Sequence, residues 1–298
     1  MNSVDRHLFC FGCGYSAIRL AHHVLAAGGR VSGTSRSVEG AARLERLGIT
    51  AHRFDGSSSL PATAFAEVTD MLTSIPPGAG GDDGVLAHHG KLLAHLDTLQ
   101  WSAVLSTTGV YGDVGGAWID ENAPLQPGTE RAARRVSCER RWLDWSRANN
   151  KPVQVFRLPG IYGPGRSPFV RLRAGTAQRL IKPGQVFNRI HVDDIARALM
   201  LAMRNPEVGP VFHLADGEPA AADVVLEYAA ALLGLSSPPA VQVEEAEISP
   251  MARQFYSECK RLSTARAQSL LGFTPLFPSY REGLAAVLAE EGDDTVPD

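Results

Sequence analysis

The first residues whose spacing could do chemistry form a glycine turn near the start of the chain. Gly12, Gly14 and Ala17 give the pattern Gly-x-Gly-x-x-Ala directly after an apolar run. The first glycine permits a tight turn from strand to helix, the second lets a ligand approach the backbone, and the small alanine lets the helix pack closely. A helix then begins at Tyr15, and the unpaired N–H groups of Tyr15 and Ser16 at its N-terminus can bind a pyrophosphate. The turn predicts a dinucleotide site; the alternative is a structural turn of another α/β domain.

Arg36 lies where the second strand should end. Proteins that prefer NAD usually carry Asp or Glu there, which binds the adenosine ribose. Here the chain reads Thr-Ser-Arg-Ser over 34–37, and no acidic residue occurs from 12 to 38. The planar Arg36 cation suits a phosphate, and Ser35 adds a donor. We therefore predict a 2′-phosphate site and NADP rather than NAD as cofactor; the alternative is a solvated loop arginine.

Further candidate cofactor contacts follow the ends of other expected strands. They are Asp55, Ser74, Ile75, Pro76 and Ser106. The carboxyl ends of parallel strands border the ligand crevice of a doubly wound sheet, which places these residues in the site. Asp55 either accepts from the adenine amino group or caps the next turn.

The elements that must position these residues alternate along the chain. Apolar runs predict strands at 8–11, 30–34, 49–54, 69–75, 101–106, 153–158 and 211–214. Helical spacing predicts helices at 15–27, 39–47, 85–100, 130–149, 169–180, 194–202, 223–235, 264–271 and 281–289. This order predicts an α/β fold, a Rossmann-type doubly wound parallel sheet of about seven strands with a smaller C-terminal substrate lobe. We expect a dinucleotide-binding domain at 1–165, with 188–216 returning to it, and a substrate lobe at 166–187 and 217–298.

Composition narrows the partners. The 298 residues carry a net charge of −3, with 25 Arg and 4 Lys scattered along the chain, which favours a small-molecule substrate and no nucleic acid. No apolar run is long enough for a membrane span, and no signal-peptide pattern is present, so we expect no membrane partner and a cytoplasmic location. The sequence leaves open whether the protein forms a homodimer. Cys10 and Cys13 form a C-x-x-C without a second pair, so no metal site is predicted.

Four further stretches carry a family resemblance. They are Ser-Thr-Thr-Gly-Val-Tyr-Gly at 106–112, Asp-Glu-Asn-Ala-Pro at 120–124, Arg-Leu-Pro-Gly-Ile-Tyr-Gly-Pro-Gly-Arg at 157–166 and Arg-Ile-His-Val-Asp-Asp-Ile-Ala at 189–196. With the glycine turn, they make the chain resemble the NAD-dependent epimerase/dehydratase group of the extended and atypical short-chain dehydrogenase/reductases.

The resemblance implies roles for residues near the fifth strand. Thr107 matches the catalytic Ser/Thr, whose hydroxyl bonds the substrate oxygen; a strand-end cap or a ribose contact are the alternatives. We add Thr108, Gly109, Tyr111 and Tyr162 as substrate contacts, since the family uses its Tyr-Gly sites to shape the pocket. His191 mainly joins the two lobes in this family.

The family's Tyr-x-x-x-Lys pair is absent from its usual place. In this family a glutamate lies four residues after the lysine, and the resemblance makes Glu139 its match. That register places Arg131 at the tyrosine position and Arg135 at the lysine position. No Tyr or Lys occurs between Gly112 and Asn150. Arginine does not release its proton at accessible pH, so it cannot act as general acid or base. The two arginines could instead hold a carboxylate or phosphate of the substrate, or form a solvated helix face.

A Tyr-x-x-x-Lys does occur at Tyr256 and Lys260, outside the dinucleotide-binding half of the sequence. We interpret this spacing as coincidence; the alternative is that the C-terminal lobe delivers a replacement acid. The resulting hypothesis is an NAD(P)-dependent oxidoreductase or epimerase/dehydratase-like enzyme acting on a sugar-like or nucleotide-sugar substrate. The alternative is a non-catalytic NADP-binding sensor or interaction protein of the same fold.

Overall fold

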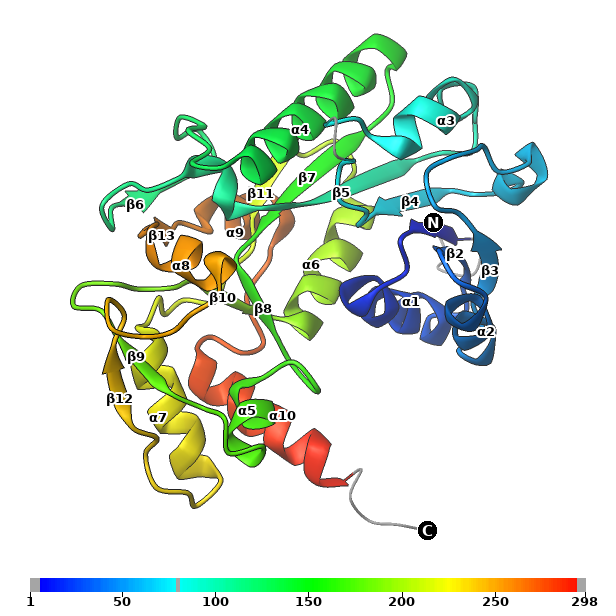
Figure 1. Ribbon diagram of the computed structural model, residues 1–298. Coiled ribbons are helices and arrows are strands. Elements are labelled where there is room, and N and C mark those ends of the chain that lie inside the picture. Colours follow the sequence, from blue (N-terminus) through cyan, green and yellow to red (C-terminus); the bar gives the residue numbers. More distant parts are fainter. Residues whose placement is uncertain (1–5, 79–80, 294–298) are drawn as a thin grey trace.

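The computed structural model describes residues 6–78 and 81–293, and a parallel sheet forms its centre (Figure 1). The seven strands of this sheet lie in the order β11-β7-β5-β4-β1-β2-β3, and every neighbouring pair is parallel. They are β1 (His7–Phe11), β2 (Arg30–Ser35), β3 (Thr50–Arg53), β4 (Asp70–Thr73), β5 (Trp101–Thr107), β7 (Val153–Leu158) and β11 (Val211–His213). The predicted Rossmann-type fold is confirmed.

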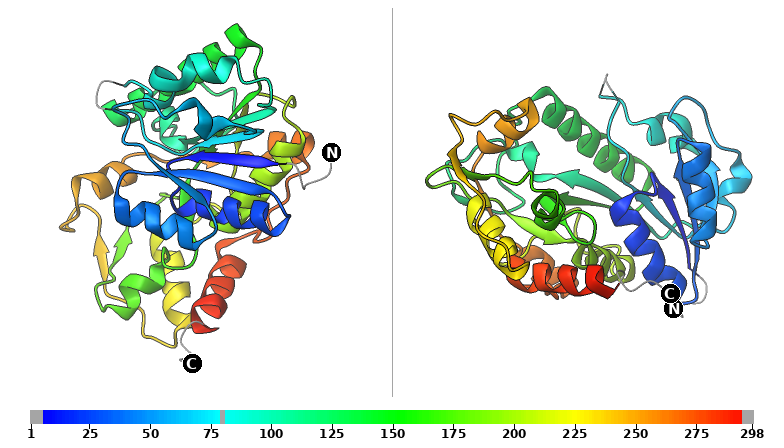
Figure 2. Two further views of the ribbon diagram at one scale, coloured as in Figure 1. Left: turned by 90° about the vertical axis from the view of Figure 1, so that its right-hand side faces the viewer. Right: turned by 60° about the horizontal axis from the view of Figure 1, so that its bottom comes forward.

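Helices cover both faces of the sheet (Figure 2). One layer contains α1 (Tyr15–Ala26) and α6 (Val192–Arg204), and the other contains α3 (Gly84–Ala94) and α4 (Glu130–Asn149). Alternation along β1 explains the two layers, because successive strand residues point to opposite faces. Leu8 and Cys10 pack in the core on the α1 side, whereas Phe9 and Phe11 pack in the core on the α3 side.

The smaller lobe is built from short strands and helices beyond the sheet. Its own strand pair is β9 (Arg179–Ile181) with β12 (Ala240–Gln242). A second pair, β8 (Gly160–Tyr162) with β10 (Arg189–His191), joins the two halves, since Ile190 packs in the core with α1 and α6 and Tyr162 packs in the core of the smaller lobe. The other elements of the described chain are α2 (Val38–Arg46), α5 (Pro168–Arg173), α7 (Ala222–Leu232), α8 (Pro250–Tyr256), α9 (Ala265–Leu271), α10 (Tyr280–Asp293), β6 (Trp118–Ile119) and β13 (Arg261–Leu262). Short 3₁₀ turns occur at Ala62–Phe65 and Thr108–Tyr111.

Two expected helices are shorter than predicted. The helix expected at 85–100 ends at Ala94, because the chain then tightens into i to i−3 hydrogen bonds before β5 begins. The helix expected at 169–180 ends at Arg173. Gly175 follows with φ +65°, a left-handed conformation that glycine adopts without penalty and that stops the helix. Strand β9 begins at Arg179, after an irregular stretch.

One C-terminal stretch that we expected in the substrate lobe packs against the dinucleotide-binding half. Ala267, Leu271 and Phe273 pack in the same core as α1 and α6, although 217–298 was assigned to the substrate lobe. The preceding strand β13 pairs with β6, which follows β5 in the chain. The stretch 261–273 therefore belongs with the dinucleotide-binding half. The last expected residues of the lobe, 294–298, lie outside the described residues, as do 1–5 of the first domain.

Candidate cofactor and active site

The glycine turn between β1 and α1 is held from both sides. The Gly12 N–H donates to Thr34 Oγ1 at 2.8 Å, and the Ser74 hydroxyl donates to the Gly12 carbonyl. Gly12 has φ +75°, and a Cβ on it would lie 3.2 Å from Ile75 Cγ1. The position therefore requires glycine, as predicted. Ser74 and Ile75 support the turn from the end of β4.

The second glycine leaves open space in front of α1. A Cβ on Gly14 would meet nothing closer than the Gly12 carbonyl oxygen at 4.0 Å. Gly14 is the N-cap of α1, no side chain caps this end, and the first turn carries no acidic residue. Helix N-termini with free N–H groups attract anions. The open approach and the uncapped helix end fit the pyrophosphate of a dinucleotide.

Residues of the first turn of α1 also join the smaller lobe. Tyr15 donates its hydroxyl to the Pro164 carbonyl at 3.1 Å, and burial raises the pKa of this phenol to about 12. Ser16 and Ala17 are buried under the turn. Tyr15 therefore positions the segment after β8 against the dinucleotide site.

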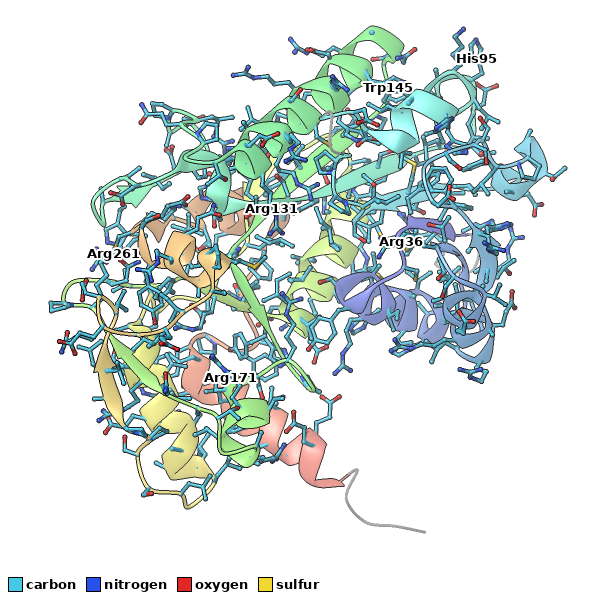
Figure 3. All side chains as sticks on the ribbon, in the orientation of Figure 1. Arg36, His95, Arg131, Trp145, Arg171 and Arg261 are labelled. Carbon is cyan, nitrogen blue, oxygen red and sulfur yellow. The ribbon has the colours of Figure 1, made fainter. Side chains whose placement is uncertain are left out.

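Arg36 stands exposed after β2, near α1 (Figure 3). Within the part of the chain that the structure describes, no carboxylate lies within ion-pair distance of its guanidinium. Ser37 caps α2 by accepting from the Gly40 N–H at 3.0 Å, and the half-buried Ser35 lies beside them. The guanidinium is thus free to meet a phosphate.

Asp55 takes the second of its two expected roles. Its carboxylate accepts from the Ser57 N–H at 2.9 Å and from the Ser57 hydroxyl at 2.6 Å, which caps the turn after β3. The residue is exposed and has its pKa lowered by these hydrogen bonds. An adenine contact stays a prediction. Pro76, beyond β4, is exposed.

Residues at the end of β5 have two kinds of role: some hold neighbouring elements in place, and others are candidate contacts to a ligand. Ser106 is buried and donates its hydroxyl to Glu139, so this side chain supports α4 and does not face a ligand as expected. Thr107 is half-buried, and its Oγ1 accepts from the Gly109 N–H at 3.2 Å. The strand-end cap is therefore real, but the Thr107 hydroxyl proton is still free to bind a substrate oxygen. Thr108 is buried at the same turn.

Two tyrosines expected at the substrate are buried in the structure instead. Tyr111 is fully buried, and its hydroxyl bonds His213 Nε2 and Arg157 Nη1, each at 2.5 Å. Tyr162 packs in the core of the smaller lobe, with its hydroxyl 3.5 Å from the Ser279 carbonyl. Neither phenol is available to a substrate, because both hydroxyl groups are buried and bonded to groups of the protein.

Tyr111 belongs to a buried polar network that the sequence did not predict. Arg157 binds Glu139 and Tyr111, and His213 Nδ1 lies 3.1 Å from the Ser263 carbonyl. His213 Nδ1 therefore donates, and Nε2 accepts from Tyr111. Burial lowers the pKa of His213 to about 4, which keeps it neutral. The signal was present in the sequence: Arg157 and His213 interrupt runs that otherwise read as apolar strands.

Arg131 and Arg135 lie on the side of α4 that carries Glu139. Arg131 is exposed near the start of α4 (Figure 3). Arg135 is half-buried. Arg135 Nη1 lies 3.4 Å from the Ile75 carbonyl, so it reaches the end of β4 beside the glycine turn. The register that places the two arginines at the family's Tyr and Lys positions stays a prediction.

The other Tyr-x-x-x-Lys is not a helical pair. Helix α8 ends at Tyr256, so Lys260 does not follow it by one helical turn. The buried Tyr256 ring contacts Phe187 edge to face, and Lys260 pairs with Glu258 at 2.6 Å. The expectation of coincidental spacing agrees with this geometry. The segment is nevertheless close to the dinucleotide-binding half in space, since the Cys259 N–H donates to Asp113 at 2.7 Å.

His191 caps α6 at the junction of the lobes. Its Nδ1 accepts from the Asp193 N–H at 3.3 Å, and its ring contacts Tyr162 and Phe277. This agrees with the expected joining role. Among the described residues, no cluster of three or more His, Cys, Asp or Glu side chains suits a metal ion, and no helix has the length and apolar character to cross a membrane.

Comparison with known proteins identifies the family. The model of the NAD dependent epimerase/dehydratase family matches residues 94–215. A solved structure of a functionally unknown conserved protein from Silicibacter pomeroyi is 43% identical, with a TM-score of 0.88 over 96% of this chain and 99% of that one. Residues 94–215 therefore form a domain of the NAD dependent epimerase/dehydratase family. The resemblance inferred from the sequence motifs is therefore confirmed.

Two further matches extend over nearly all of this chain. A 3-diazoavenalumate denitrifying reductase from a Streptomyces species is 28% identical over 293 residues, which is 87% of this chain and 92% of that protein. The dTDP-glucose 4,6-dehydratase of Bacillus anthracis, solved in complex with NAD, has a TM-score of 0.78 at 14% identity and covers 97% of both chains. The second likeness shows the shared fold.

Proposed function

We propose that this epimerase/dehydratase family protein is an NADP-dependent oxidoreductase or epimerase/dehydratase-like enzyme that acts on a sugar-like or nucleotide-sugar substrate. One observation carries the proposal. The open, uncapped turn at Gly14 shares one edge of the sheet with Thr107, whose hydroxyl proton is free. A dinucleotide on the turn would extend toward this hydroxyl along the carboxyl ends of the strands. We expect the smaller lobe to carry the substrate subsite.

The choice of NADP rests on Arg36. Its exposed guanidinium has no carboxylate partner among the described residues, and the end of β2 carries no acid to bind ribose hydroxyls. A planar cation at this position suits the 2′-phosphate. The NAD-bound relative shows that this fold also accepts the other dinucleotide, so the preference must be measured.

The chain's own residues must orient the substrate without the usual tyrosine. A bound nicotinamide supplies hydride chemistry. Thr107 donates its hydroxyl proton in a hydrogen bond to the substrate oxygen, with Thr108 and Gly109 shaping the same turn. Arg131 stabilises negative charge but cannot release a proton, so protons come from solvent or from the substrate itself. The matching dTDP-glucose 4,6-dehydratases support a nucleotide-sugar substrate, and the matching reductase supports hydride transfer.

A second candidate function is a non-catalytic NADP sensor. The observation in its favour is the replacement of the family's acid/base pair by Arg131 and Arg135. A sensor would bind the dinucleotide tightly and leave every substrate unchanged. The two functions therefore differ in turnover and agree in cofactor binding.

Turnover by the purified protein separates them. NADPH oxidation is followed by absorbance with a panel of sugars, nucleotide sugars and other carbonyl compounds, and products are identified by mass spectrometry. We expect product with at least one substrate and its loss in Thr107→Val. Product identification is needed because an epimerase regenerates its cofactor. Tight NADPH binding with no product from any substrate would favour the sensor.

A further inference from the structure

We propose that Arg131 and Arg135 form an oxyanion site, and that the substrate carries a carboxylate or phosphate group that binds there. The inference rests on the proposed function, because it assigns this pair to the substrate of the same site. It adds a chemical class: an anionic, not a neutral, sugar-like molecule.

The first argument is the face of α4 on which the pair lies. Residues four apart on a helix share a face, so Arg131, Arg135 and Glu139 form one row. Glu139 ends this row under β5, where it accepts from Ser106. Arg135 reaches the Ile75 carbonyl at the end of β4. Arg131 precedes Arg135 by one helical turn in this row, near the start of α4 (Figure 3).

The second argument is the charge of Arg135. This guanidinium is half-buried, and burial lowers its pKa. Among the described residues, it donates one hydrogen bond, to the neutral Ile75 carbonyl. A cation that is partly removed from water without an anionic partner is unfavourable, so an arriving oxyanion would stabilise it.

The acids that act on Arg135, namely Glu139 and Asp83, already accept hydrogen bonds from other residues. Glu139 accepts from Arg157 at 2.8 Å, and Asp83 accepts from the Trp142 indole at 2.7 Å and from the Val85 N–H at 2.9 Å. Across residues 6–78 and 81–293, neither Arg131 nor Arg135 has a carboxylate within ion-pair distance.

Two other arginines of the same helix have acidic partners. Arg134 pairs with Glu130 at 3.3 Å, and Arg147 pairs with Asp144, both within α4. Arg140 and Arg141 have no ion pair among the described residues, but both are exposed to solvent. Arg135 differs from them because it is half-buried and still has no carboxylate partner.

The position of the pair indicates what the anion would do. Ile75, which Arg135 contacts, also borders Gly12 of the dinucleotide turn. An oxyanion on the pair would therefore lie beside the dinucleotide and near Thr107. Guanidinium groups fix such a group by paired hydrogen bonds and stabilise negative charge without taking part in proton transfer.

The test uses three sugar probes on the full chain, with and without saturating NADP. Glucuronate carries a carboxylate, glucose 6-phosphate carries a phosphate, and glucose carries neither. We expect the Tm and the titrated Kd to reveal binding of at least one anionic probe and none of glucose. The preferred probe identifies the group. Arg131→Gln and Arg135→Gln should each weaken that probe by about tenfold or more, as expected for one charge-assisted hydrogen bond.

Arg140→Gln is the matched control, because Arg140 is exposed on the same helix one residue after Glu139. It should leave the affinity for the probe unchanged. Equal binding of all three sugars, or no loss in Arg131→Gln and Arg135→Gln, would overturn the oxyanion site. Loss of NADP affinity with normal probe binding in Arg135→Gln would assign that residue to the cofactor. Failure of the wild type to bind NADP would instead overturn the proposed function, and the titration without NADP still tests the anion site.

Discussion

The Arg157 guanidinium forms a buried ion pair with the Glu139 carboxylate, to which it donates two hydrogen bonds. Its Nη2 lies 2.8 Å and its Nε 3.1 Å from Oε2. Both side chains are almost fully buried, at 5% and 1% exposed. The pair joins β7 to α4 beneath the end of β5, because Glu139 also accepts from Ser106. It therefore fixes the helix that carries Arg131 and Arg135.

Glu139→Gln should destabilise the protein strongly. The substitution leaves the Arg157 charge buried without an anion, which costs about 3–5 kcal/mol. Chemical denaturation measures the free energy of unfolding. Glu130→Gln is the control on the same helix, since Glu130 is exposed and its ion pair with Arg134 contributes little. Equal losses in the two variants would contradict the role of the buried pair.

Substitutions at the two glycines of the turn should separate folding from binding. Gly12→Ala should lower the free energy of unfolding by about 1–3 kcal/mol, since alanine is strained at φ +75° and its Cβ crowds Ile75. Gly14→Ala should leave stability nearly unchanged, because the added Cβ meets no close atom. It should still weaken the dinucleotide by about tenfold or more, because the methyl group occupies the approach of the pyrophosphate. Thermal unfolding and cofactor titration give both values, and normal cofactor affinity in Gly14→Ala would place the dinucleotide elsewhere.

Arg36→Ala should change the cofactor preference. Loss of one charge-assisted contact to the 2′-phosphate should weaken NADP by about 10-fold or more and leave NAD affinity unchanged. Calorimetric titration of both dinucleotides measures the ratio. Arg46→Ala, an exposed arginine at the end of α2, serves as the control for lost surface charge. An unchanged ratio in Arg36→Ala would remove this residue from the site.

Asp216 should make stability fall as the pH rises. Burial raises the pKa of this carboxyl from 3.8 to about 7, and among the described residues its Oδ2 atom has no hydrogen-bond partner. Between these two pKa values the folded state holds a proton that the unfolded state has released, so stability decreases with pH by up to about 4 kcal/mol. The charged groups that act on Asp216 are Arg189, Glu218 and Asp194.

Asp216→Asn should remove this dependence. The gain of the variant over the wild type should be small near about pH 4 and largest above about pH 7. Unfolding free energies of both proteins across this range give the difference, in which the opposite contribution of His213 cancels. That contribution is lost as the pH falls from 6.5 to about 4, because the buried imidazole stays neutral while the unfolded one is protonated. A gain that is constant with pH would show that Asp216 keeps an ordinary pKa.

Much of the fold could be predicted because its signals are local. Apolar runs that alternate with helical spacing predict parallel strands and covering helices, and Gly12 marks a backbone conformation that few other residues adopt. The lengths of α3 and α5 were less predictable. Their ends depend on i to i−3 turns and on the pairing of β9 with β12, which are set by neighbouring segments.

The candidate site divides in the same way. By itself the sequence determined the glycine turn, the arginine after β2 and the absence of the Tyr-Lys pair, because each depends on residue type at a short spacing. Only the tertiary structure decided that Tyr111 and Tyr162 are buried and that Ser106 serves Glu139. Only it brought Arg135 to Ile75, sixty residues away in the sequence. The physical reason is competition: a polar group binds the partner that packing brings to it, and residue type alone does not reveal that partner.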